Sequence, residues 1–326
     1  MVYQYATVIG DPTETVANQI NAYLVDAPII FIDKRSKPLC KVPEMTKGSS
    51  PTDDGNLLLT QEERDAILQA DPSLFEIIRS FTGAKEYLHN QSRYCIWLKD
   101  ISPSKYNHSK EIMGRLAKVK EYRSKSDRTA TKKFAQFPSL FVEIRQPDSD
   151  YIIVPRHSSE NRQFIPIGFL DKNIIAGDAT AFIPNATLYE FGVVTSTMHM
   201  AWMRYVCGRL EMRYRYSNTI VYNNFPFPKP TDEQKGVIIK EAQRVIDARK
   251  KYPELSLAEL YEATSMLPEL VKAHQKLDKA VEAAYGKTFE TDADRVTHLF
   301  NLYQEMTDGL FTEKPKQAKR RTKPIK

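Results

Sequence analysis

Charged and apolar residues alternate along one short segment in the second half of the chain. Its charged positions are Arg209, Glu211, Arg213 and Arg215, and the residues between and after them are Leu210, Met212, Tyr214 and Tyr216. Because alternate residues of a β-strand point to the same face, a strand here would present the four charges together. Such a row suits the base edges of DNA, where Arg binds guanine O6 and N7 and Glu accepts from cytosine N4. The alternative is an exposed strand whose charges pair with one another.

A second segment could contact phosphates. Residues 105–133 contain ten Lys or Arg and three acids, a local charge of +7. Ile112, Leu116 and Val119 recur at helical spacing, so we predict a helix over 109–126 with one apolar stripe and a basic opposite face. Phosphate contacts set the register of a protein on DNA and carry no sequence information. A basic face can also be plain solvated surface. The candidate phosphate-binding residues are Lys118, Lys120, Arg123, Lys125 and Arg128.

Net charge alone says little about this chain of 326 residues. It totals +6, but the seven Lys or Arg from Lys314 to Lys326 include no acid among them, so residues 1–313 sum to −1. We expect the basic tail, 313–326, to be disordered. No apolar run approaches the roughly 18 residues of a membrane span, and the three cysteines are far apart and odd in number. These features predict a cytoplasmic protein without a membrane partner.

The sequence lacks the motifs of several enzyme classes. No two glycines are closer than seven residues, whereas a loop for S-adenosylmethionine or a dinucleotide needs clustered glycines. There is no Walker GxxxxGK[ST] motif, no Pro-Pro pair, no HExxH and no GxSxG. Asn224-Phe225-Pro226 is therefore interpreted as structural, and His199, in an apolar run, as a core histidine. No catalytic or metal-ligating residues are predicted.

The elements that must position these residues fall into two regions. Short strands are predicted over 139–228, interrupted by one helix at about 187–206, and helices follow the proline-rich segment Phe225–Pro230. The expected fold class is α+β, a mixed α/β domain over 1–228 followed by an all-α helical bundle over 229–312. The other predicted elements are helices at 61–70, 72–81, 231–251, 256–265, 268–285 and 292–308 and a strand at 93–98.

Seven motifs occur in a specific order along the chain. They are Asn21–Ala27, Arg35–Cys40, Arg93–Leu98, Pro155–Arg162, Ile165–Leu170, Met198–Trp202, and Tyr214–Ser217 through Val221–Pro226. Together they resemble the C-terminal half of the MmeI-like fused restriction–modification enzymes, over about residues 1–310. In that family one polypeptide carries a nuclease, a helical connector, an adenine-N6 methyltransferase domain, a target-recognition domain and a helical C-terminal domain.

The resemblance implies that 1–228 form the target-recognition domain and 229–312 the helical C-terminal domain. The chain would then be a bacterial module that recognises double-stranded DNA for an adenine-specific DNA methyltransferase. S-adenosylmethionine would bind to a methyltransferase catalytic domain or subunit outside this chain, which would hold no cofactor and would not be catalytic alone. The alternative is a protein-interaction module that docks on a methyltransferase core.

The resemblance also assigns base-reading positions. Glu211, Arg213 and Arg215 match positions that the family uses to read base pairs near the methylated adenine. Arg156 and Asp178 resemble a second pair that acts together, and Ala179 would act similarly with Arg215. Chemically, Arg156 with Asp178 suits a G·C pair, with Arg on guanine and Asp on cytosine, and Glu211 with Arg213 suits another.

Overall fold

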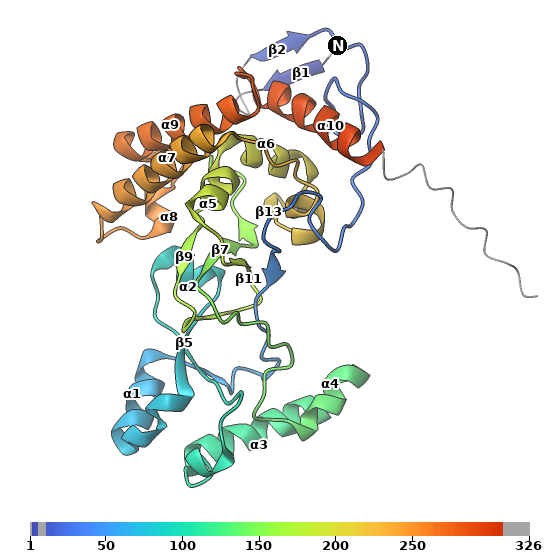
Figure 1. Cartoon of the computed structure of the whole chain (residues 1–326). Coiled ribbons are helices and arrows are strands. Elements are labelled where there is room, and N and C mark those ends of the chain that lie inside the picture. The colour runs from blue at the N-terminus through green and yellow to red at the C-terminus, as the bar shows by residue number, and fades with distance from the viewer. Residues whose placement is uncertain (1, 6–10, 309–326) are drawn as a thin grey trace, which may run out of the picture.

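The computed structural model describes residues 2–5 and 11–308, and it is elongated (Figure 1). A helical layer lies at one end, small sheets lie in the middle, and a smaller lobe lies at the other end. The predicted fold class is confirmed, because mixed strands and helices precede a helical C-terminal region. The tail predicted to be disordered lies outside the described residues. Within the described part, no helix is long and apolar enough to cross a membrane.

A four-stranded antiparallel sheet forms the middle of the molecule, with strand order β3-β11-β7-β9. Both faces of its central strands are buried. Along β7, Ile152 and Val154 belong to the large core under the helices, whereas Tyr151 and Ile153 belong to a small cluster on the other face. This alternation is the period-two pattern of a strand. The bounds are β3 Thr46–Lys47, β7 Tyr151–Pro155, β9 Gly168–Leu170 and β11 Thr180–Pro184.

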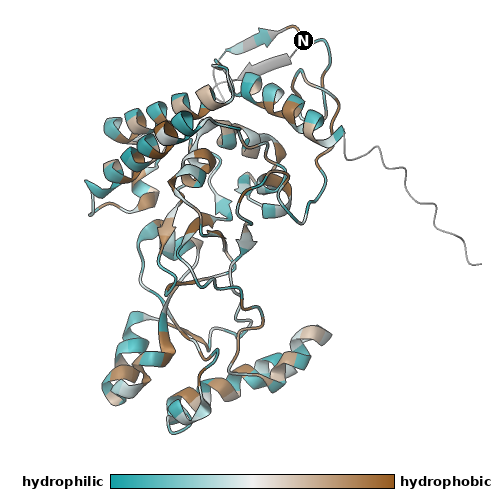
Figure 2. Ribbon diagram, in the orientation of Figure 1, coloured by the Kyte–Doolittle hydropathy of each residue, from teal (hydrophilic) through white to brown (hydrophobic). Residues whose placement is uncertain are grey.

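The helical layer shares one core with this sheet. Phe191, Trp202, Val245, Leu277 and Phe300 come from five different helices, and all are fully buried in the same cluster as Ile152. The core therefore continues across residue 228, where the sequence predicts a domain boundary. That boundary stays a prediction. Figure 2 shows hydrophilic and hydrophobic residues on the same outer helices, as amphipathic helices require. The helices are α5 Leu188–Thr195, α6 Thr197–Val206, α7 Asp232–Lys250, α8 Leu257–Leu260, α9 Pro268–Ala284 and α10 Asp292–Asp308.

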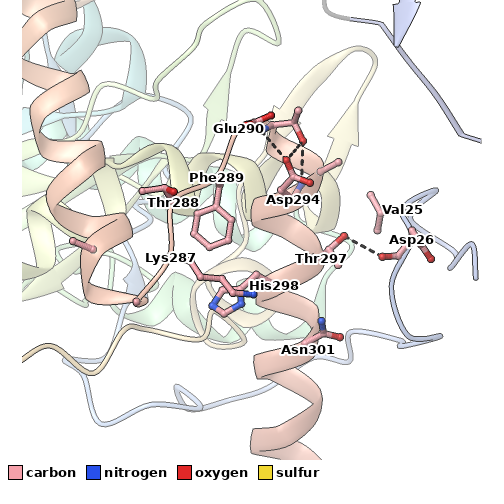
Figure 3. A pocket seen from close by; sticks show the side chains of 14 residues that line it. Val25, Asp26, Lys287, Thr288, Phe289, Glu290, Asp294, Thr297, His298 and Asn301 are labelled. Carbon is pink, nitrogen blue, oxygen red and sulfur yellow. Dashed lines mark hydrogen bonds between the residues drawn. The ribbon is translucent and has the colours of Figure 1, made fainter. Parts of the chain in front are cut away.

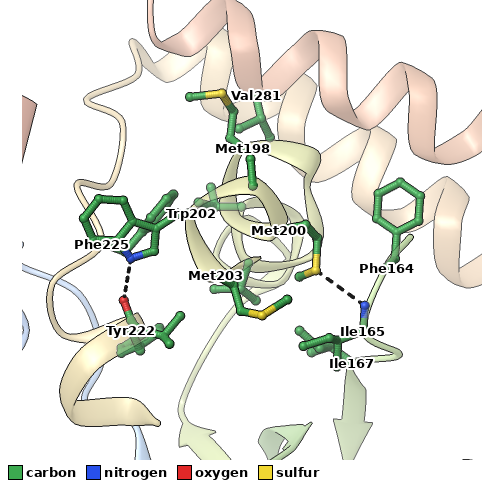
Figure 4. Close-up of a cluster of buried hydrophobic side chains, with 14 of the residues drawn as sticks. Phe164, Ile165, Ile167, Met198, Met200, Trp202, Met203, Tyr222, Phe225 and Val281 are labelled. Atoms are coloured by element: carbon green, nitrogen blue, oxygen red, sulfur yellow. Dashed lines mark hydrogen bonds between the residues drawn. The ribbon is translucent and has the colours of Figure 1, made fainter. Parts of the chain in front are cut away.

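The single helix predicted at 187–206 is two helices. Ser196 has an extended backbone between α5 and α6, and Asp278 of α9 accepts hydrogen bonds from the Thr197 backbone N–H and hydroxyl, both at 2.7 Å. Helix α6 can therefore begin as a separate helix, because the backbone N–H of its first residue, Thr197, has a hydrogen-bond partner. Its apolar side chains fill the core in Figure 4, where the Trp202 indole donates to the Val221 carbonyl at 3.0 Å.

The smaller lobe has its own core around Trp97, Leu116 and Phe141. Its sheet has the order β10-β5-β6-β4, and β10 pairs in parallel with β5. Because β10 directly precedes β11 along the chain, it ties the lobe to the central sheet. The bounds are β4 Leu58–Leu59, β5 Ile78–Thr82, β6 Tyr94–Ile96, β10 Ile175–Ala176, α1 Gln61–Ala70, α2 Ala84–His89, α3 Lys110–Ser124 and α4 Thr129–Lys133.

The helix predicted at 72–81 is wrong in its second half. Asp71 caps the start and Pro72 occupies the first turn, but the helical segment ends at Ile77 and β5 begins at Ile78. Residues 78–82 pair with strands on both sides, so tertiary pairing overrides the local helical pattern. The predicted strand at 93–98 is confirmed as β6, and the predicted helix at 109–126 is confirmed as α3.

Asp278 makes the stability depend on pH. Burial raises its pKa from 3.8 to about 6, against the opposing effect of the Thr197 hydrogen bonds. A raised folded-state pKa stabilises the fold below about pH 4, and this contribution is lost as the pH rises through 6. Asp278→Asn cannot titrate, so its stability relative to wild type should rise by up to about 3 kcal/mol between pH 4 and 7. Urea unfolding at several pH values measures this, with the exposed Asp247→Asn as control. A stability difference that does not change with pH would refute the assignment.

Candidate nucleic-acid interface

The alternating segment is a hairpin and not one strand. β12 (Gly208–Leu210) turns at Glu211 and Met212 and returns as β13 (Arg213–Arg215), which pairs on its other side with β8 (His157–Ser158). Cross-strand partners share a face. Since Arg209 pairs with Tyr214, it lies on the face opposite Arg213 and Arg215. The prediction that all four charges project together is therefore wrong, because the turn interrupts the alternation.

The two arginines of β13 form an exposed face. Arg213 and Arg215 are exposed, while Tyr214 between them and Tyr216 after them are 5% and 1% exposed and belong to the core. The predicted division into a charged face and an aromatic face thus holds for β13. Leu210 and Met212, predicted on the face opposite the charges, are 51% and 68% exposed at the hairpin tip.

Arg209 braces the hairpin from its other face. Its guanidinium stacks over the Tyr214 ring at 4.1 Å and donates to the carbonyls of Met212 at 3.1 Å and Arg204 at 3.4 Å. These contacts fix the turn that carries Glu211. Glu211 is exposed and has a φ of 55°, a left-handed conformation that costs a non-glycine residue free energy.

Backbone hydrogen bonds of Arg156 join the three segments that carry the predicted base readers. The Arg156 N–H donates to the Ala179 carbonyl at 3.1 Å, and the Arg156 carbonyl accepts from the Tyr216 N–H at 2.8 Å. The Arg156 side chain also donates to the Asp178 carbonyl at 2.9 Å. The structure thus brings Arg156, Asp178 and Ala179 beside the end of β13, where Arg215 lies, while Glu211 is at the hairpin tip.

The Asp178 carboxylate does not pair with the Arg156 guanidinium. It accepts from the Ser50 hydroxyl at 3.0 Å and lies 3.7 Å from the Lys47 ammonium. The Asp178 side chain is 47% exposed, so part of its carboxylate remains accessible to solvent. Sequence analysis missed Lys47 and Ser50, since they are more than 120 residues away in sequence and have no motif of their own.

The cluster around β8 is strongly positive. Burial and the neighbouring Arg215 lower the pKa of Arg156, with Asp178 opposing them. Burial, followed by Arg156, Arg215 and Arg213, lowers the pKa of His157. Arg213 and Arg215 share one face of β13, and His157 pairs with Arg215 across the ladder, so these side chains lie on the same side of the sheet. A concentration of positive donors of this kind suits the acceptor atoms of a guanine edge or a phosphate.

Two family models together match residues 26–311 of the chain. The family model "MmeI, target recognition domain" matches residues 26–229, and "MmeI, C-terminal domain" matches 230–311. The chain belongs to the MmeI family. The predicted resemblance is therefore confirmed, and the MmeI-family chain carries the target-recognition and C-terminal domains of that family.

Two relatives are much longer than this chain. DNA methyltransferase A of Bacillus subtilis (strain 168) is 36% identical over 299 residues, which cover 91% of this chain and 34% of that protein. The solved structure of the Type IIL restriction–modification enzyme MmeI in complex with DNA is 45% identical, with a TM-score of 0.88, over 94% of this chain and 41% of that one. The MmeI-family chain thus spans about a third to two-fifths of these relatives.

The predicted phosphate-binding residues divide into two groups. Lys118, Lys120, Lys125 and Arg128 are exposed on or next to α3, and Lys125 forms an ion pair of 2.6 Å with Glu121. This basic face lies in the smaller lobe, at the end of the folded molecule opposite the helical layer (Figure 1).

Arg123 cannot have the predicted role. It is fully buried, and its three guanidinium nitrogens donate to five backbone carbonyls, so no N–H is left for a phosphate. Sequence analysis did not detect the burial, because Arg123 follows Val119 by one helical turn on the apolar stripe. Its role is to join the ends of loops in the smaller lobe. The accepting carbonyls belong to Pro51, Thr52, Phe134, Phe137 and Leu140.

Two structural interpretations are confirmed in the core of the MmeI-family chain. Asn224 is fully buried and donates to the carbonyls of Asp33, Thr219 and Ile220. His199 is also fully buried and shares a 2.8 Å hydrogen bond with the Tyr216 hydroxyl. Both side chains hold neighbouring segments together behind the hairpin.

The strained turn predicts an unusual mutational result. Glu211→Gly should raise the free energy of unfolding by about 1 kcal/mol relative to Glu211→Ala, because glycine adopts the left-handed conformation without strain. Urea unfolding of the two variants and of wild type measures the difference. Glu211→Asn, which also tolerates this conformation, is a matched control and should lie between them. A glycine variant less stable than the alanine variant would contradict the assigned turn geometry.

Proposed function

We propose that this chain is the sequence-specific, duplex DNA recognition module of an adenine-N6 DNA methyltransferase of the restriction–modification type. The observation that carries the proposal is the convergence at Arg156. Three segments far apart in sequence, each with predicted base-reading residues, meet through its backbone hydrogen bonds. Membership in the MmeI family supports it, as does the DNA in the solved MmeI structure.

Base reading and phosphate binding are assigned to different lobes. Arg156, Arg213 and Arg215 offer guanidinium donors for guanine O6 and N7, and Asp178 and Glu211 offer carboxylates for cytosine N4. Ala179, next to Asp178, leaves room for a base edge or a thymine methyl. The exposed cations on and just after α3, Lys118, Lys120, Lys125 and Arg128, hold phosphates and fix the register of the duplex.

The methyltransferase chemistry belongs to a partner. S-adenosylmethionine binds to a catalytic domain or subunit that corresponds to the part of the relatives that this chain does not cover. This chain positions the target base for that catalytic domain. The N-terminal segment offers a contact surface, because the side chains of Val16, Leu24, Ile29 and Phe31 are 60–77% exposed. Exposed apolar side chains gathered in one segment favour a protein contact.

A cavity of about 1200 Å³ adjoins this segment (Figure 3). It lies between Val25 and Asp26 on one side and α10 and the loop before it on the other, where the Thr297 hydroxyl donates to the Asp26 carbonyl at 3.1 Å. None of the predicted base-reading or phosphate-binding residues line it. We assign this cavity to the docking of a partner protein and not to DNA. The protein-interaction module, the alternative from the sequence, is then a second role of the same chain.

Selection from a pool of randomised duplexes tests the DNA-binding function, followed by salt titration of the selected site. The full chain should enrich one sequence, and log affinity should fall linearly with log salt concentration. Lys118→Ala with Lys120→Ala should reduce the salt slope by about 2, one for each lost phosphate contact, and leave the selected sequence unchanged. Lys272→Ala with Lys276→Ala on α9 is the matched control. No enrichment, or binding to a methyltransferase alone, would favour the interaction module.

A charge exchange tests the assignment of one base pair. In the double variant Arg156→Asp with Asp178→Arg, donor and acceptor trade places, so the preferred base pair at one position should change, for example from G·C to C·G. Duplex selection measures the change, and the two single variants should lose discrimination at that position by about 1–3 kcal/mol without gaining a new preference. Weaker binding of the double variant with an unaltered site would count against the pair, provided that thermal unfolding shows an intact fold.

A further inference from the structure

His157 occupies the exposed face of the three-stranded sheet. It pairs across β8 and β13 with Arg215, so the two side chains share a face. Its neighbour Ser158 pairs with Tyr214 on the other face, and both of these residues are buried, at 4% and 5% exposure. The imidazole therefore points to the same side as the arginines of β13, while the next residue in the strand points into the core.

Three arginines act electrostatically on this imidazole. Burial, followed by Arg156, Arg215 and Arg213, lowers the pKa of His157, which favours the neutral ring. The side chain is half-buried. Arg156 precedes it in sequence and Arg215 faces it across the ladder, so His157 lies between two of the residues assigned to base reading.

The ring nitrogens of His157 have no hydrogen-bond partner among the described residues. Three other histidines have one: His199 bonds to the Tyr216 hydroxyl, His274 to the Tyr261 hydroxyl and His108 to Asp71, at 2.7–2.8 Å, whereas Nε2 of His298 is buried without a partner. A half-buried, neutral imidazole has one donor and one acceptor to use. On this face, both remain available to a ligand.

We propose that His157 is a further base-contacting residue, whose ring N–H donates to the N7 atom of a purine in the major groove. The proposal rests on the DNA-binding function proposed above. The three arginines favour an acceptor-rich ligand at this place, and N7 is the acceptor that adenine and guanine share in the major groove. His157 thus distinguishes purine from pyrimidine at one position, next to the base pairs assigned to Arg156 and Arg215.

Duplex selection with the full chain tests this inference. His157→Ala should reduce the preference for purine over pyrimidine at one position by about tenfold, the size of one base contact, and leave the preferences at other positions and the salt slope unchanged. His157→Gln keeps an N–H donor and should retain part of the preference. His89→Ala, at an exposed position on α2, is the matched control and should select the wild-type site.

The outcomes separate this inference from the function it rests on. If wild type selects a site and His157→Ala selects it with the same preference at every position, the inference fails and the DNA-binding function stands. Equal weakening at every position, with a lowered thermal midpoint, would mark His157 as structural and also overturn the inference. If wild type selects no site, both fail.

Discussion

The proposed recognition surface depends on the two backbone hydrogen bonds of Arg156. A buried peptide group must find a partner, and here the partners are Ala179 on one side and Tyr216 on the other. These bonds fasten the hairpin to the end of β7, a central strand of the sheet, beside the start of β11. Because the sheet is itself held by the large core under the helices, the arginine face is carried by a rigid scaffold. Preorganised side chains lose less entropy on binding than mobile ones do.

The scaffold separates two kinds of positive charge. The arginines around His157 lie beside the central sheet, and the lysines of α3 lie in the smaller lobe, which β10 joins to that sheet. The buried Arg123 holds the loops of the lobe together and so supports the basic face without belonging to it. A chain with net charge near zero outside its tail can therefore still present two basic surfaces.

Local patterns in the sequence predicted much of this structure, and long-range pairing explains most of what they missed. The apolar stripe predicted α3, and the first residues of the helical segments at Gln61 and Pro72 were predicted correctly. The hairpin was missed because its turn, Glu211-Met212, lacks the Gly or Asn that marks such turns. The contacts of Asp178 with Lys47 and Ser50 arise only when distant segments meet.

The structure of the full chain bound to its selected duplex tests the central claim most directly, because it shows which face of the hairpin enters the DNA. We predict that the guanidinium groups of Arg213 and Arg215 lie within about 3.2 Å of base-edge atoms in the major groove. Arg209 should remain stacked on Tyr214, away from the bases. A duplex that lies on another surface, or arginines of β13 that contact phosphates alone, would contradict it.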